Sequence, residues 1–165
     1  MGPPCPKCGK EFVRRAHREG VLERLLSLAY IYPFRCQLCT HRFRTCQWGI
    51  RYSKQPRDHR EYARVETRFP VTFSGDETSG NGMVTLVSMG GCAIETETKL
   101  SPGAILQLQL QTSDREPAVT VDAVVVRSVR SKSVGLQFLR LGMEEKERLG
   151  QFVRCLLMSR PPFEA

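Results

Sequence analysis

The sequence predicts a mainly β protein: a six-stranded antiparallel barrel with a C-terminal helix, preceded by a small N-terminal zinc-binding domain that contains a short helix. Two pairs of closely spaced cysteines and an excess of basic residues mark the first third of the 165-residue chain. The remainder is electrically neutral and contains short β-prone runs separated by turn residues. These features predict a zinc-binding domain over residues 1–50, a linker over 51–58 and a barrel domain over 59–160.

Charge is distributed unevenly along the chain. Residues 1–58 contain 12 Lys and Arg against 4 Asp and Glu, and therefore carry all of the net charge of +8. Residues 59–165 contain 13 residues of each sign. Such a change of composition is expected at a domain boundary, and charge alone gives no reason for the barrel to bind nucleic acid.

Four cysteines in the basic segment have the spacing of zinc ligands. Cys5 and Cys8 form one Cys-x-x-Cys pair, and Cys36 and Cys39 form a second after 27 intervening residues. Zinc prefers four soft ligands in a tetrahedron, and one tight turn can supply two of them. We therefore expect these four thiolates to hold one structural Zn²⁺ ion. The sequence leaves open whether His41 or Cys46 also takes part.

Apolar residues recur at helical spacing between the two cysteine pairs. They are Val21, Leu22, Leu25, Leu26 and Ala29. This pattern predicts a short amphipathic helix that ends at Pro33 and packs its apolar side on the core of the domain. The arginines and aromatic residues around it form either a solvated basic face or a surface for nucleic acid or an anionic membrane.

Six β-prone runs follow the linker. They cover residues 62–73, 82–88, 92–97, 104–112, 119–129 and 133–139. Leu106, Leu108 and Leu110 alternate with glutamines, as in a strand with one buried face. A helix is then predicted over residues 143–158, with glutamates in its first turn and an arginine near its end. Short strands without intervening helices favour an antiparallel barrel.

Two motifs of the barrel segment resemble those of PilZ domains, and the similarity covers residues 58–158. The run from Arg60 to Arg64 resembles the Arg-x-x-x-Arg motif that precedes the first strand of that family. Residues 86–91 resemble the second motif, Asp/Asn-x-Ser-x-x-Gly: Ser88 and Gly91 match, and Leu86 stands where the family has Asp or Asn. Residues 124–127 and 135–138 resemble the last two family strands. The cysteine-containing segment is similar to bacterial zinc-ribbon modules.

The resemblance implies a receptor for cyclic di-GMP in bacterial second-messenger signalling, with Arg60, Arg64, Ser88 and Gly91 as binding residues. Arginine can grip a phosphate or a guanine edge with two donors and can stack on a base. A serine hydroxyl adds a small donor, and a glycine lets the backbone approach the ligand closely. Leucine cannot accept a hydrogen bond, so Leu86 implies binding that is weakened or lost.

Three functions without catalysis fit this sequence. The first is the cyclic di-GMP receptor with an unidentified protein partner, the second is a ligand-independent adaptor of the same fold, and the third is a nucleic-acid-binding protein that acts through the basic domain. An enzyme is not expected, because the three histidines lie in basic polar surroundings without a neighbouring nucleophile. The sequence has neither a signal-peptide pattern nor an apolar run of 18 residues, so we expect a cytoplasmic location.

Overall fold

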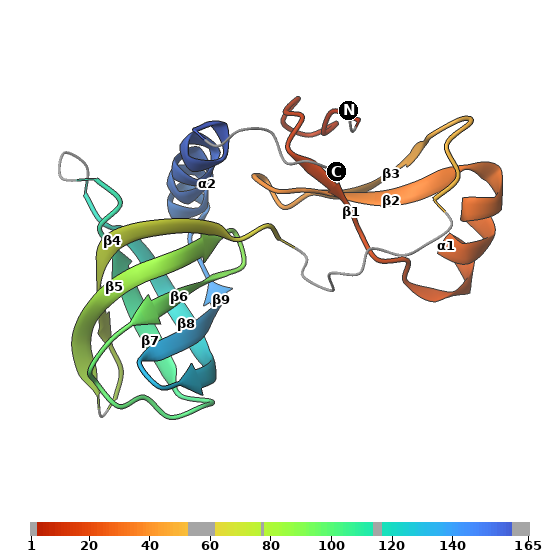
Figure 1. Cartoon of the computed structure of the whole chain (residues 1–165). Helices are drawn as coiled ribbons and strands as arrows, with labels where there is room; N and C mark the ends of the chain where they lie inside the picture. The colour runs from red at the N-terminus through yellow and green to blue at the C-terminus, as the bar shows by residue number, and fades with distance from the viewer. Residues whose placement is uncertain (1–2, 53–61, 77, 114–116, 160–165) are drawn as a thin grey trace. The chain divides into compact units, whose positions relative to one another are not determined.

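The computed structural model describes residues 3–52, 62–76, 78–113 and 117–159. The chain forms two compact units, Met1–Ala63 and Arg64–Ala165, which we call the N-terminal unit and the barrel unit (Figure 1). Within the described ranges, no helix has the length and apolar character needed to cross a membrane.

The N-terminal unit contains a three-stranded antiparallel sheet with the order β1-β2-β3. Its strands are β1 (Val13–Arg15), β2 (Ile31–Cys36) and β3 (Arg42–Cys46), and α1 (Gly20–Leu26) with the 3-10 helix η1 (Ser27–Ala29) connects β1 to β2. The central strand β2 buries Tyr32 and Phe34. Figure 1 shows α1 at one end of this sheet. Because β2 begins directly after η1 and ends on Cys36, this cysteine lies at the opposite end of β2 from the helical segment.

The sequence-based prediction of the helix was wrong in two respects. The helical segment ends at Tyr30, whose φ of 59° is left-handed, and Pro33 lies inside β2, where the carbonyl of Pro33 accepts a hydrogen bond from the Ala16 N–H. Pro33 lies opposite Ala16, just past the end of β1 at Arg15, so its missing N–H costs at most one bond at the margin of the strand pairing. The predicted apolar face is also exposed, and the buried side chain of α1 is Glu23.

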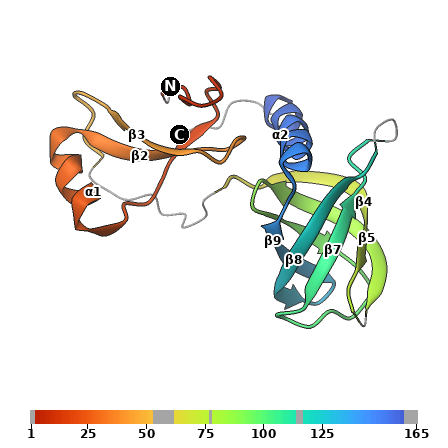
Figure 2. The same ribbon diagram turned by 180° about the vertical axis from the view of Figure 1, so that it is seen from behind.

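The barrel unit is a closed six-stranded antiparallel barrel, as predicted (Figures 1 and 2). Its strand order is β4-β5-β6-β9-β8-β7. Its strands are β4 (Val65–Ser74), β5 (Ser79–Ser88), β6 (Gly91–Glu95), β7 (Ile105–Leu110), β8 (Val119–Arg130) and β9 (Ser133–Arg140). The first strand, β4, pairs with both β5 and β7 and so closes the barrel.

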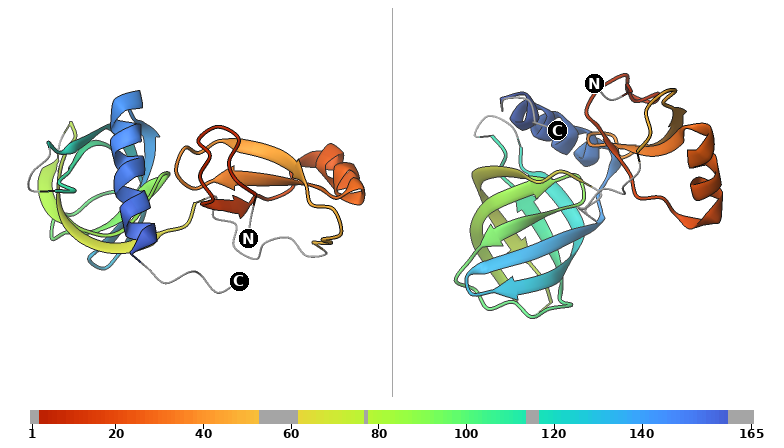
Figure 3. Two further views of the ribbon diagram at one scale, coloured as in Figure 1. Left: turned by 90° about the horizontal axis from the view of Figure 1, so that it is seen from above. Right: turned by 45° about the vertical axis from the view of Figure 1, so that its right-hand side comes forward.

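Alternating side chains fill the barrel. Leu106, Leu108 and Leu110 of β7 are buried while the glutamines between them are exposed, which confirms the predicted half-buried strand. The helix α2 (Met143–Met158) begins and ends where the sequence predicts and packs against the barrel (Figure 3). The ring of Phe152 meets that of Phe69 of β4 edge-on, with 5.2 Å between the ring centres.

Candidate metal centre and ligand site

The four predicted zinc ligands meet at one end of the N-terminal unit. The Sγ atoms of Cys5, Cys8, Cys36 and Cys39 all lie within 4.8 Å of one another. The Cys5 and Cys39 sulfurs are 3.6 Å apart, and the Cys8 and Cys36 sulfurs are 3.7 Å apart. Four sulfurs placed tetrahedrally at about 2.3 Å from a zinc ion would be separated by about 3.8 Å. The cluster therefore has the dimensions of a tetrahedral metal site.

Two turns of similar backbone design hold these cysteines. The N–H of Cys5 donates to the carbonyl of Lys10, and the N–H of Cys36 donates to the carbonyl of His41, both at 2.9 Å and both spanning five residues. The fourth residue after the leading cysteine is left-handed in each turn, with φ of 68° at Gly9 and 62° at Thr40. In the second turn, the backbone N–H groups of residues 38 and 39 also point at the Cys36 sulfur, at 3.5 Å each.

The ionisation of the four thiols indicates that a bound cation would stabilise this cluster. Burial raises the pKa of the Cys36 thiol to about 12 and also raises the pKa of Cys39. At Cys5, burial acts in the same direction, but the neighbouring backbone N–H donors outweigh it and the pKa is lowered. A thiol that coordinates a divalent metal is held as the thiolate. Bound metal would therefore keep all four sulfurs charged in a space where bare thiolates would repel one another.

Neither His41 nor Cys46 belongs to the four-sulfur cluster found among the described residues. The His41 ring instead lies parallel to that of Phe43, with the ring centres 6.0 Å apart. Cys46 is exposed and pairs with Ile31, at the end of the sheet away from the cysteine turns.

Three of the four predicted ligand-binding residues lie at one end of the barrel. Arg64 is exposed and immediately precedes Val65, which pairs with Val87, so Arg64 lies beside the end of β5 that carries Ser88. Ser88 in turn pairs with Gly91. Burial raises the pKa of the Cys92 thiol to about 12, and the positive charge of Arg64 opposes that rise. The fourth residue, Arg60, falls outside the described ranges.

Ser88 and Gly91 also have roles in the barrel itself. The buried Ser88 hydroxyl donates to the carbonyl of Gly91 at 3.1 Å and accepts from the N–H of Gly90 at 3.4 Å, and so holds the turn between β5 and β6. A Cβ atom at Gly91 would lie 2.2 Å from the carbonyl oxygen of Leu136 on β9. Gly91 is therefore required by the close approach of β6 and β9, whatever the ligand.

Leu86 lies on the outer face of the barrel, two residues before Ser88. It is half-buried and pairs with Glu66 of β4 on one side and Ala93 of β6 on the other. An irregularity between residues 84 and 86 separates Leu86 from the inward-facing Val84. A polar side chain at this position would thus face outward, on the same side of the strand as Ser88.

The family model of the PilZ domain matches residues 58–155. The chain belongs to the PilZ domain family. The match includes both motifs and extends into α2, so the PilZ barrel accounts for the whole barrel unit except its last few residues.

Solved PilZ structures share this fold at low sequence identity. The inhibitor of motility MotI/DgrA of Bacillus subtilis is 20% identical with a TM-score of 0.52, over 65% of this chain and 58% of that protein. The PilZ domain of YcgR from Escherichia coli, determined with c-di-GMP, is 14% identical with a TM-score of 0.52, over 61% of this chain and 93% of that domain. MrkH of K. pneumonia is 16% identical with a TM-score of 0.52, over 88% of this chain and 75% of that protein.

At these identities the likeness establishes the fold alone. The chain spans 58% of the length of MotI/DgrA. None of the curated proteins is a significant match to this sequence.

Two polar residues beside the PilZ motifs were missed in the sequence. Gly91 pairs with Gln137 of β9, and the Gln137 side-chain oxygen accepts a hydrogen bond of 2.6 Å from Arg127 of β8. Both side chains are exposed next to the Ser88–Gly91 turn. In the sequence, Gln137 follows the apolar Leu136, and this alternation indicates that Gln137 faces outward. The sequence does not show that β9 lies beside β6, which is known only from the strand order.

Tyr62 and Ala63 of the first PilZ motif lie in the N-terminal unit. Tyr62 accepts a hydrogen bond on its hydroxyl from Arg35 at 3.2 Å, and the Arg35 guanidinium lies 5.6 Å from the centre of the Tyr62 ring. The N–H of Ala63 donates to the buried side-chain oxygen of Gln37 at 2.6 Å. Gln37 lies between the ligands of the second cysteine turn. Ala63, one residue before Arg64, is therefore hydrogen-bonded to the second cysteine turn.

Proposed function

We propose that this protein is a cyclic di-GMP receptor whose N-terminal unit, folded around Zn²⁺, carries the response to a protein partner. The observation that carries the proposal is the position of Arg64 beside the Ser88–Gly91 turn at one end of the PilZ barrel. The YcgR domain of the same fold was determined with c-di-GMP, which supports the same ligand here.

The chemistry of the residues suits this ligand. Cyclic di-GMP carries two phosphates and two guanine faces, and an exposed arginine can bind either through charge-assisted hydrogen bonds. We assign this role to Arg64 and, from the motif, to Arg60. The barrel unit has no net charge of its own, so attraction for a dianion depends on these arginines rather than on a general basic surface.

The attachment of the first motif to the N-terminal unit supports a signalling role. A ligand that changes the backbone at Arg64 acts one residue from the hydrogen bond between Ala63 and Gln37. That contact is next to Cys36, so the change would reach the metal-binding turn directly. Segments that adopt a new order on ligand binding are a common basis of switching.

We assign Zn²⁺ to the four cysteines because four sulfur donors in a tetrahedral cluster are typical of structural zinc. The ion would link the turn of residues 5–9 to the turn of residues 36–40 as a fixed cross-link. Its coordination sphere would be complete without water, so it supplies structure rather than reactivity.

Replacement of Arg64 by alanine is expected to weaken cyclic di-GMP binding by about tenfold to a hundredfold, because a hydrogen bond to a charged group contributes roughly 1.5–3 kcal/mol. The measurement is calorimetric titration of the full chain. The matched control is Arg130→Ala, which removes an exposed arginine from the hairpin of β8 and β9 at the other end of the barrel. Absence of heat with wild-type protein at near-millimolar ligand would refute the receptor function.

A ligand-independent adaptor is the second candidate function. It is favoured by Leu86, which offers no acceptor at the position of the motif's Asp or Asn, and by the structural roles of Ser88 and Gly91. In this case the barrel requires Ser88 and Gly91 for its own structure, with or without a ligand. The outer face of the barrel would then contact a protein.

The variant Leu86→Asn distinguishes these two functions. A receptor weakened at one position should gain about tenfold to a hundredfold in affinity, since the amide restores an acceptor beside Ser88. Asparagine is preferable to aspartate, because an aspartate would face Glu66 across the strand pair. Affinity and melting temperature should be measured together. Unchanged affinity with a lower melting temperature would show that Leu86 is a packing residue and would favour the adaptor.

A further inference from the structure

Four apolar side chains cover one side of the helical segment and point into solvent. Val21, Leu22 and Leu25 of α1 and Leu28 of η1 are 70%, 61%, 59% and 69% exposed. Their spacing of i, i+1, i+4 and i+7 places them on one side of a helix. We call these four residues the leucine face. An exposed apolar group of this size on a soluble unit marks an interaction surface.

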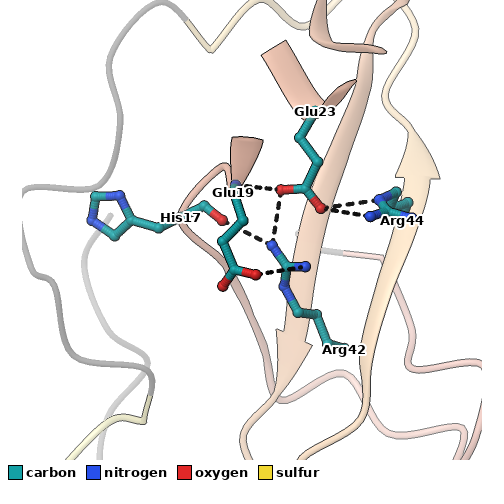
Figure 4. Close-up of polar contacts among 5 residues, drawn as sticks. All are labelled: His17, Glu19, Glu23, Arg42 and Arg44. Atoms are coloured by element: carbon teal, nitrogen blue, oxygen red, sulfur yellow. Dashed lines mark hydrogen bonds and ion pairs between the residues drawn. The ribbon is translucent and has the colours of Figure 1, made fainter. Parts of the chain in front are cut away.

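The orientation of the leucine face is fixed by the opposite side of α1. Glu23 is 1% exposed, and its carboxylate accepts hydrogen bonds from Arg42 at 2.8 Å, from Arg44 at 3.0 Å and from the N–H of Glu19 at 2.7 Å (Figure 4). Arg42 also donates to the carbonyl of His17 at 3.0 Å. Rotation of the helix to bury the leucines would break this network. The unit thus holds the leucine face outward.

Trp48 extends the apolar surface. It is 82% exposed, and its ring lies 5.3 Å from that of Tyr30, the residue that ends η1. The N–H of Gln47 donates to the carbonyl of Tyr30 and holds the segment after β3 beside the helical segment. Ile50, 47% exposed, follows two residues later. Tryptophan is enriched at the boundary between lipid headgroups and acyl chains.

Two exposed arginines lie beside this apolar surface. Arg24 lies on α1 and is exposed, and Arg51 lies 5.4 Å from the centre of the Tyr30 ring. Residues 1–58 carry a net charge of +8, and four thiolates together with one Zn²⁺ ion would lower it only to +6. Basic residues near an anionic membrane surface are attracted to it, and apolar side chains on the same surface can enter the headgroup boundary.

We propose that the leucine face and Trp48 dock the N-terminal unit on an anionic lipid bilayer. The charge argues against a second copy of the chain as the occupant, because two basic units would repel each other. It is also not the surface expected for nucleic acid, because phosphates would engage the arginines but leave the leucines without a partner. The metal centre lies at the opposite end of β2, so docking leaves the cysteines unobstructed.

Trp48 provides a direct test, because it is the only tryptophan in the chain. Metal-replete full-length protein is mixed with vesicles of equal parts phosphatidylcholine and phosphatidylglycerol, and its emission is recorded. We expect a shift to shorter wavelength that is absent with pure phosphatidylcholine and reduced by high salt. The double variant Leu22→Ser with Leu25→Ser should lower the vesicle partition coefficient about tenfold or more.

The control carries two serines on the barrel unit instead. Ile105 and Leu139 are both 54% exposed, and replacing both with serine should leave vesicle binding unchanged. An unchanged Trp48 spectrum in the wild-type protein overturns the proposal, as does equal binding to neutral vesicles. Self-association or duplex-DNA binding in place of vesicle binding also overturns it. The wild-type readout stands even where a serine variant fails to fold.

Discussion

Removal of the metal is expected to unfold the N-terminal unit and to leave the barrel unit folded. The N-terminal sheet has three strands of three, six and five residues and buries few large side chains, chiefly Tyr32, Phe34 and Leu38. Units of this size need a metal or another cross-link to compensate for the loss of chain entropy. Structural zinc contributes roughly 10–16 kcal/mol in small zinc-binding domains. The barrel has its own closed core, and none of its described residues belongs to the cysteine cluster.

The aromatic residues allow the two units to be followed separately. Trp48 and all four tyrosines of the chain lie within residues 1–63, so near-ultraviolet circular dichroism from these residues reports the N-terminal unit alone. After treatment with a strong chelator this signal should collapse, while the far-ultraviolet thermal transition of the barrel persists. Elemental analysis of reduced, untreated protein should find about one zinc per chain.

Matched serine variants provide the control for chelation. Cys36→Ser removes a buried cluster sulfur that also accepts two backbone N–H contacts, and should abolish metal binding and the near-ultraviolet signal. Cys46→Ser changes an exposed cysteine of the same unit and should do neither. A metal-free preparation that keeps the native aromatic signal would refute the proposed role of zinc.

The parts of the fold that depend on local pattern were predicted from the sequence. The cysteine pairs place two ligands in each turn, and the alternation of leucine and glutamine in β7 identifies its buried face. The barrel strands agree with their predicted runs to within a few residues, the largest differences lying at the starts of β4 and β5. The strand order, which brings Gln137 beside Gly91, depends on long-range pairing that local pattern does not contain.

The face of α1 could not be predicted in the same way. Helical periodicity shows that apolar side chains share one side, and burial of that side is the usual outcome. Here the carboxylate of Glu23 is buried because Arg42 and Arg44 reach it from a strand 19 and 21 residues later. Nothing within the helical segment reveals these partners. From the sequence, where only their charge is visible, Arg42 and Arg44 are expected on the outside of the unit.

Replacement of Glu23 by alanine is expected to lower the free energy of unfolding of the N-terminal unit by about 3–5 kcal/mol, because removing one partner of a buried ion pair leaves the other charge uncompensated. The Arg42 side chain is only 23% exposed and would lose its principal carboxylate. The measurement is thermal unfolding of metal-replete protein followed by the aromatic signal. The Glu19→Ala variant is the control: Glu19 pairs with the same arginine at 3.4 Å, but its side chain is 68% exposed, so it should cost below about 1 kcal/mol.

The pH dependence of the free energy of unfolding distinguishes the electrostatic contribution of Glu23 from its contribution to packing. Burial acts to raise the pKa of Glu23, but the Glu19 N–H and the two arginines outweigh burial and lower it below the usual range. A carboxylate with a lowered pKa contributes stability above its unfolded pKa and loses this contribution as the pH falls through the folded value. The stability difference between wild type and Glu23→Gln should therefore shrink in acid. A difference independent of pH would show that α1 is held by packing, and the outward orientation of the leucine face would then need another cause.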